Sequence, residues 1–260
     1  MEWKDNQLEH ILYDIWLTKI KGLGPIKQRS LLKKYRTAQD VFYAKEAELS
    51  AIRELTGEDI KQILGSRELD AAKEILEKCM HNEIKVVTLE DSQYPYLARE
   101  IPDMPILLYC KGILRENICG NTIVGSRRCS KEGKEKTAAL SKKLVQEGKT
   151  IISGMAKGID SYAHTACIRN GGYTIAVLGN GLDICYPKEH NLLMKRIEEN
   201  GLLVSEYEPG VPPSKYRFPR RNRIMAAMAD EIYVTEAGRG SGALITADFG
   251  RKYGRKVHIL

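Results

Sequence analysis

Small residues, hydroxyls and fixed cations follow several apolar segments in the second half of the sequence. In chain order they are Gly125, Ser126, Arg127, Ser153, Gly154, Lys157, Gly179, Ser241 and Gly242. Glycine lets an oxyanion approach backbone N–H groups, while arginine and lysine supply countercharge. This pattern is typical of a phosphate-binding site. For any single loop, the alternative is that glycine merely allows a tight turn.

A second group of cations lies in the segment from Lys215 to Arg223, where five of nine residues are basic and two aromatic residues are interleaved. Cations that hold a backbone and rings that stack on bases suit single-stranded nucleic acid. The polar members of this candidate site are Arg220, Arg221, Asn222 and Arg223. Because these arginines also open an expected helix, where cations oppose the macrodipole, they indicate an anionic ligand or an acidic partner. The alternative is a solvated basic loop.

A third basic segment lies nearer the N-terminus. Residues 15–39 contain seven Lys or Arg and no acidic residue. Within this segment, Ile20–Ile26 contains a Gly-Leu-Gly sequence between two helical patterns. It is similar to a helix-hairpin-helix turn, whose backbone amides hold a DNA phosphate; the alternative is a plain turn.

Candidate catalytic and cofactor groups are few. Asp160 and His164 are spaced for one helix face, either as an acid–base pair or as a helix cap and a packing contact. Glu206 and Glu236 follow strands, where an enzyme of this fold class would place its carboxylates. The GxGxxG pattern fails after Gly179, and the sequence has no P-loop and no HExxH motif. We therefore expect no cofactor and no metal.

The elements that must position these residues alternate between strand and helix after residue 120. Strands are expected at 84–89, 106–109, 122–124, 150–152, 173–178, 202–204, 231–234 and 257–260, and helices at 130–147, 160–170, 189–199, 222–228 and 243–253. Such alternation predicts an α/β fold with a doubly wound, mostly parallel sheet. Because ligands bind beyond the carboxyl ends of parallel strands, the loops listed above should converge on one edge.

The first 82 residues have apolar positions at helical spacing and predict a small all-α domain. We place the domains at residues 1–82 and 83–260. The net charge of the chain is +7. Residues 1–82 carry 14 basic and 14 acidic side chains, so the whole excess lies in the second domain. This distribution favours a polyanionic partner.

Several protein classes are disfavoured by composition. The six cysteines form no CxxC pair, which favours reduced thiols in a cytoplasmic protein. No apolar run reaches the length of about 18 residues that a membrane span needs. The first residues lack the basic-then-apolar layout of a secretory signal.

The loops taken together resemble those of the DprA/Smf family, the bacterial DNA-processing proteins. The matching segments are Val124–Arg127, Ser153–Asp160 with Ala163 and His164, Thr174–Gly179, Gly181–Asp183, Tyr186–Pro187, Ser205–Tyr207, Phe218–Ile224, Glu236–Ala237, Ser241–Gly242 and Thr246–Ala247. They occur in order over residues 90–260, with an upstream Tyr94–Pro95 pattern that also fits. The helical domain resembles the family's SAM-like or helix-hairpin-helix domain by type alone.

The resemblance implies a Rossmann-like domain that binds single-stranded DNA without catalysis. It further implies a homodimer that protects incoming DNA in natural transformation and loads the RecA recombinase onto it. Arg127 and Lys157 would be the main phosphate-binding cations, and Ser126, Ser153 and Gly154 would line the pocket. Arg221, Asn222 and Arg223 would lie at its rim.

Two further expectations follow from the same comparison of motifs. Related Rossmann-like enzymes cleave nucleoside monophosphates at the glycosidic bond, so a phosphoribohydrolase is the alternative function. Its PGGxGTxxE string is absent, and the segment from Glu236 to Gly242 is only a loose analogue. The family normally continues beyond the strand expected at 257–260, which implies that this chain is either a truncated form or only the ordered part of a longer protein.

Overall fold

The computed structural model describes residues 5–116, 118–238 and 240–260. It divides into two compact units: one contains Met1–Leu89 and Pro102–Leu107, and the other contains Glu90–Ile101 and Leu108–Leu260. Our boundary near residue 82 placed the strand at 84–89 in the second domain, whereas this segment lies in the first unit. Each unit is described by itself below.

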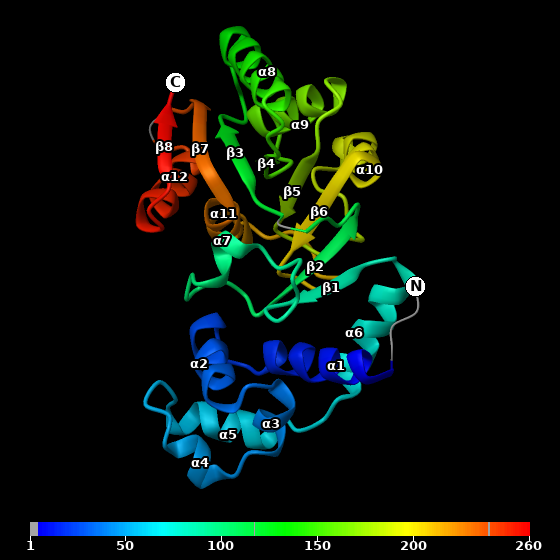
Figure 1. The fold of residues 1–260 in the computed structure, drawn as a ribbon, viewed down its shortest axis with the longest axis vertical. Coiled ribbons are helices and arrows are strands. Elements are labelled where there is room, and N and C mark those ends of the chain that lie inside the picture. Colours follow the sequence, from blue (N-terminus) through cyan, green and yellow to red (C-terminus); the bar gives the residue numbers. More distant parts are fainter. Residues whose placement is uncertain (1–4, 117, 239) are drawn as a thin grey trace. The chain divides into compact units, whose positions relative to one another are not determined.

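The first unit is a cluster of short helices, drawn in blue to cyan in Figure 1. Its elements are α1 (Asp5–Lys19), α2 (Pro25–Tyr35), α3 (Ala38–Tyr43), α4 (Glu46–Ser50), α5 (Gly57–Gly65), α6 (Asp70–His81) and the strand β1 (Lys85–Thr88). Thr37 and Thr56 begin α3 and α5 because each hydroxyl accepts a hydrogen bond from the amide three residues later. Fully buried Leu17, Leu31 and Ile63 contribute to the core of this unit.

The second unit is built around a mostly parallel sheet. Its elements are α7 (Tyr96–Arg99), β2 (Leu107–Gly112), β3 (Gly120–Gly125), α8 (Lys131–Gln146), β4 (Ile151–Ser153), α9 (Ile159–Arg169), β5 (Thr174–Leu178), the 3₁₀ turn η1 (Lys188–His190), α10 (Asn191–Asn200), β6 (Gly201–Ser205), α11 (Arg217–Ala227), β7 (Ala229–Glu236), α12 (Gly242–Lys252) and β8 (Lys256–Ile259). The strand order is β2-β6-β5-β4-β3-β7-β8. The β2–β6 pair is antiparallel, and the pairs from β6 to β8 are parallel. The predicted α/β, Rossmann-like fold is confirmed.

Helices cover both faces of this sheet (Figure 1). Successive side chains of a strand point to opposite faces, and β3 shows both. Ile123 packs in a core cluster with Leu144 of α8 and Ala163 of α9. The hydroxyl of its neighbour Thr122 donates to the carbonyl of Met225 in α11, over 3.0 Å. Helices α8 and α9, with α10 beside α9, therefore lie on one face, and α11 and α12 on the other.

Helix α11 begins earlier than the sequence pattern predicted. It starts at Arg217, whereas we expected Asn222. Pro219 does not prevent this start, because proline is tolerated in the first turn, where the missing N–H would have no helical partner. The arginines from 220 to 223 consequently lie within the helix and not at its opening.

His164 links helix α9 to the sheet and makes stability depend on pH. Its Nδ1 lies 2.7 Å from the Thr174 hydroxyl, and burial lowers the pKa of His164 to about 3. The unfolded imidazole titrates near pH 6.5, so below that pH the unfolded state binds more protons than the folded state. The free energy of unfolding should therefore fall by about 1.4 kcal/mol per pH unit as the pH decreases from about 6.5.

Urea unfolding at about pH 7.5 and about pH 5 measures this effect, with an expected loss of roughly 2 kcal/mol from His164 alone. The variant His164→Gln should lose correspondingly less between the same two pH values. An identical pH dependence in both proteins would contradict this role for His164.

All six cysteines are free, and four of them are buried. Throughout the described ranges, no helix combines the length and the apolar character that crossing a membrane requires.

Candidate functional site

A cavity of about 690 Å³ opens at the carboxyl edge of the sheet in the second unit. The end of β3, the loop after it, the start of α11 and the start of α12 supply most of its lining. It brings together the following predicted residues: Gly125, Ser126, Arg127, Arg221, Asn222, Ser241 and Gly242. The expected convergence of several loops on this edge therefore exists in the structure.

Glycines fix the loop that carries Arg127. A Cβ atom on Gly125 would lie 2.5 Å from the Ile159 side chain, so only glycine fits at the end of β3. The amide of Ser126 donates to the Glu236 carbonyl over 2.7 Å, and the amide of Ile159 donates to the Ser126 carbonyl over 3.1 Å. Gly158 has a φ of +77° and lies against the carbonyls of this loop. The backbone at Arg127 is thus held between β7 and the start of α9.

Arg221 forms the floor of the cavity and is only 4% exposed. Its Nη1 donates to the carbonyl of Gly154 over 2.8 Å and to that of Val177, which ties the ends of β4 and β5 together. A Cβ on Gly154 would lie 2.5 Å from this guanidinium, so glycine makes room for it. Burial lowers the pKa of Arg221 to about 10, and the positive charge of Arg127 acts in the same direction. Arg221 remains charged at neutral pH.

Asp160 organises the loop between β4 and α9. Its buried carboxylate accepts from the amides of Gly154 over 3.2 Å and Ala156 over 3.3 Å. Burial raises the pKa of Asp160, while the charge of Arg221 opposes that increase. We offered a helix cap as one interpretation, but the N-cap of α9 is Gly158. Since His164 binds Thr174, the two residues are positioned as structural groups and not as an acid–base pair.

An aromatic pair forms one wall. The rings of Tyr186 and Phe218 are stacked, with centroids 5.3 Å apart and planes inclined by 20°. The guanidinium of Arg127 lies 5.8 Å from the centroid of the Phe218 ring. A Cβ on Gly179 would lie 3.0 Å from Phe218, so glycine leaves room for the ring here, and Gly179 does not line the cavity. Tyr186 is 44% exposed and open to a ligand.

The N-terminus of α12 also lines the cavity. The Ser241 hydroxyl accepts from the amide of Ala243 over 3.3 Å and caps the helix. The side-chain amide of Asn222 donates to the Gly242 carbonyl over 3.1 Å, which joins α11 to α12. The first turn of α12 contains no acidic residue, so its amides and dipole favour an anion there.

Other predicted site residues do not line the cavity. The fully buried Ser153 hydroxyl donates to the Ile123 carbonyl over 2.6 Å. Arg223 is buried in an ion pair with Glu206, and the half-exposed Arg220 lies 3.5 Å from the same carboxylate. Direct contact of Ser153, Arg220 or Arg223 with a ligand stays a prediction. The hydrogen bond and ion pairs that these side chains make within the protein do not support it.

Lys157, expected to be a main phosphate-binding cation, lies on the surface beside Glu189. The two side chains form an ion pair and both remain more than half exposed. The hydrogen bond from Lys157 lowers the pKa of Glu189. Exposed ion pairs contribute little to stability, so this contact does not prevent Lys157 from binding another anion.

The lining residues that the predicted site lacks include two cations, Arg128 and Lys215, and two aromatic residues, Tyr186 and Phe218. No described residue pairs with the Arg128 guanidinium or the Lys215 ammonium. The basic and aromatic segment at 215–223 already signalled Lys215 and Phe218, while nothing local signalled that Tyr186 would stack on Phe218. Arg239 lies outside the described residues.

Both strand-end carboxylates bind protein groups. Glu206 pairs with Arg223 as described above. Glu236 accepts from the Ser130 hydroxyl over 2.6 Å and from the Ser130 amide over 2.9 Å, at the start of α8. The phosphoribohydrolase alternative needs free carboxylates at this edge, and this arrangement does not favour it.

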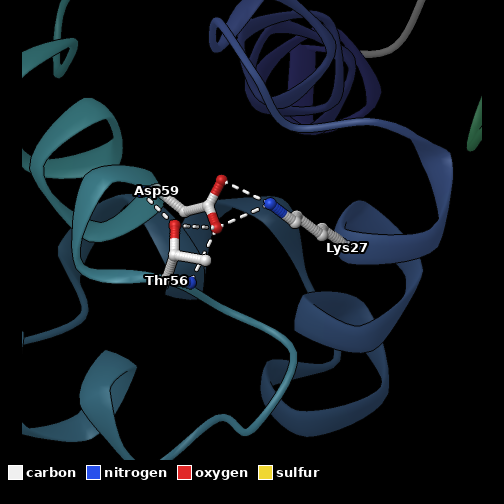
Figure 2. A network of polar contacts seen from close by, with 3 residues as sticks. All are labelled: Lys27, Thr56 and Asp59. Atoms are coloured by element: carbon white, nitrogen blue, oxygen red, sulfur yellow. Dashed lines mark hydrogen bonds and ion pairs between the residues drawn. The ribbon is translucent and has the colours of Figure 1, made fainter.

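The N-terminal basic segment belongs to the first unit and is partly neutralised. The turn expected between two helices is present, between α1 and α2, and Gly22 there has a φ of +84°. The Lys27 ammonium lies 2.7 Å from both carboxylate oxygens of Asp59, which also accepts from Thr56 (Figure 2). Desolvation would raise the pKa of Asp59, but its hydrogen bonds from Lys27 and Thr56 outweigh it and lower the pKa. Lys27 therefore has a partner within its own unit.

Comparison with known proteins identifies similar chains. The family model described as DNA recombination-mediator protein A matches residues 85–260. Protein Smf of Synechocystis is 38% identical over 252 residues, which cover 94% of this chain and 63% of that protein. DNA processing protein DprA of Streptococcus pneumoniae is 44% identical over 171 residues, which cover 65% of this chain and 60% of that protein. The chain therefore spans less than two thirds of the length of these relatives.

Two solved structures are also similar. The crystal structure of DprA from Streptococcus pneumoniae has a TM-score of 0.80 and 30% identity, and the match covers 100% of this chain and 87% of that one. A structure of DNA processing protein A from Helicobacter pylori, solved to describe its single-stranded DNA binding mode, has a TM-score of 0.60 and 31% identity. That match covers 67% of this chain and 80% of the other.

Proposed function

Because the chain belongs to the DNA recombination-mediator protein A family, we propose that it binds single-stranded DNA in the cavity at the carboxyl edge of its sheet. The observation that carries this proposal is the lining itself. Three cations, Arg127, Arg128 and Lys215, share one cavity with the stacked pair Tyr186 and Phe218. The H. pylori relative whose structure describes single-stranded DNA binding supports the same ligand.

The cations of the lining suit the phosphate of a nucleotide, and its aromatic rings suit the base. Phosphates would bind the guanidiniums of Arg127 and Arg128 and the ammonium of Lys215. The α12 N-terminus at Ser241 and Gly242 offers backbone N–H groups to a further phosphate. A base would stack on the Phe218 and Tyr186 rings. An unpaired strand presents its bases to such rings, whereas a duplex keeps them stacked inside.

Sequence preference should be weak. Phosphate contacts and stacking carry little base information, since every base has a phosphate and a flat face. Titrating labelled single-stranded and double-stranded oligonucleotides at two salt concentrations tests the proposal. Equal affinity for both forms, or affinity independent of salt, would overturn it.

Phe218→Ala should weaken binding of single-stranded DNA by roughly 5- to 150-fold, which corresponds to the about 1–3 kcal/mol that stacking of one base contributes. Tyr216→Ala is the matched control, because Tyr216 is an exposed aromatic residue two positions away that does not line the cavity. Fluorescence anisotropy with the same oligonucleotide measures both variants. Equal losses of affinity would place the stacking surface elsewhere.

We infer that the role of this cavity is binding and not catalysis, since Glu206 and Glu236 are both engaged by protein groups. Incubation with nucleoside monophosphates, followed by chromatography for free base, tests this inference. Release of base that disappears in the variant Glu236→Gln would overturn it.

We further propose that the protein works as a cytoplasmic homodimer that protects incoming DNA in natural transformation and loads RecA onto it. The family description, DNA recombination-mediator protein A, and the name of the relative DNA processing protein DprA support the part of this assignment that concerns DNA processing. RecA filament formation on oligonucleotide precoated with a single-strand-binding protein, with and without this chain, tests the loading step. A sizing measurement tests the dimer. No acceleration of filament formation would contradict RecA loading by this chain.

A further inference from the structure

A second large hollow, of about 710 Å³, lies in the second unit between helices α8, α9 and α10. We refer to it as the three-helix groove. It is lined from Ser161 near the start of α9 to Arg169 at its end, so it follows the length of that helix. Helix α9 packs against both α8 and α10, which form the two sides. The groove shares no lining residue with the cavity assigned to DNA.

The surface of the three-helix groove is mainly apolar and its central residues are small. Its lining includes Ala138 and Ala139 of α8 and Ala166 of α9, whose small side chains leave room for those of another molecule. Larger apolar groups stand at the sides, where Leu192 is 64% exposed and Tyr162 is 38% exposed. An apolar hollow of this kind on a helical surface is typical of a protein-binding site.

Cations surround this apolar surface, one from each helix. They are Lys142 of α8, Arg169 of α9 and Arg196 of α10. All three are exposed, and no described residue forms an ion pair with any of them. The acidic residue of the lining is Glu189, whose carboxylate is already paired with Lys157. The groove therefore has unbalanced positive charge around an apolar centre.

We propose that the three-helix groove docks an acidic segment of a partner protein that carries large apolar side chains. The apolar side chains would fill the space above the alanines, and carboxylates would pair with the three cations. A nucleic acid strand suits this surface less well, because the described lining holds no stacked aromatic pair like Tyr186 and Phe218 and its centre is apolar. The groove thus extends the protein's role from binding DNA to recruiting a second protein.

The test is selection of a displayed library of random peptides, about twelve residues long, on the full chain. Enriched peptides should combine Asp or Glu with Leu, Ile, Phe or Trp. Synthetic copies should bind at least about tenfold more weakly to the double variant Arg169→Glu, Arg196→Glu, because like charges then face each other. The variant Ala139→Glu should have the same effect by filling the centre of the groove. The double variant Lys136→Glu, Lys143→Glu is the matched control, since it reverses two exposed charges of α8 outside the groove.

Circular dichroism and thermal unfolding confirm that each variant is folded. Peptide binding should persist in Arg127→Ala and in the presence of saturating oligonucleotide, which separates the groove from the DNA cavity. Enriched peptides without acidic residues, or with equal affinity for all groove variants, would overturn the proposal. Loss of oligonucleotide binding in folded groove variants would instead assign this surface to nucleic acid and would also overturn it.

Discussion

Replacing Arg127 with alanine should weaken binding of single-stranded DNA by at least about tenfold. The backbone next to Arg127 is held by hydrogen bonds to β7 and to the start of α9, so the position of this cation in the cavity is fixed. Its guanidinium lies beside the Phe218 ring, so it reaches a phosphate next to a stacked base. Arg221, which also lines the cavity, is already held by the carbonyl groups of Gly154 and Val177.

The salt dependence distinguishes a phosphate contact from general damage. Removing one phosphate contact should reduce the slope of log K against log salt by about 0.7 for a single strand. Anisotropy titrations at several salt concentrations give both the affinity and the slope. Lys143→Ala is the matched control, because it removes one exposed cation from the last turn of α8, far along the helix from the cavity. An Arg127→Ala variant with unchanged affinity and slope would remove the main support for the proposed site.

Arg221→Met should destabilise the folded protein by about 3 kcal/mol, since two buried carbonyl groups lose their donor and Asp160 loses a nearby positive charge. The carbonyls of Gly154 and Val177 both accept from this guanidinium, and methionine offers no donor. For a chain of this size, such a loss lowers the melting temperature by roughly 6–12 °C. The effect arises because the Arg221 guanidinium joins the ends of β4 and β5 next to the cavity.

Arg220→Met provides the matched comparison for this prediction. The two arginines are neighbours in α11, but Arg220 is half exposed and its carboxylate contact is 3.5 Å long. Its replacement should change the free energy of unfolding by less than about 1 kcal/mol. Thermal and urea unfolding of both variants measure the difference. Equal destabilisation by the two substitutions would show that Arg221 has no special structural role.

The order of elements in the second unit was predictable because it depends on local pattern. Apolar runs such as Thr174–Leu178 predicted strands, and the helical patterns between them predicted crossovers. Parallel strands joined by crossovers place all their carboxyl ends at one edge, so the positions of Gly125, Ser126 and Arg127 followed from connectivity alone. The start of α11 at Arg217 was missed. The basic segment that contains Pro219 resembles a loop in sequence, but the first turn of a helix tolerates proline.

The sequence by itself determined the fold class and the edge of the sheet where the candidate site is expected, because strand alternation, glycine after strands and clustered cations are all local signals. Only the tertiary structure decided which cations remain available. Arg221 and Arg223 are arginines like Arg127, but both already have partners in the protein. Arg221 donates to the carbonyls of Gly154 and Val177, and Arg223 pairs with Glu206. The stacking of Tyr186 on Phe218 likewise depends on the tertiary structure, because the two residues are distant in the sequence. Burial and pairing depend on groups that are distant in the chain, and only folding brings those groups within hydrogen-bonding or stacking distance.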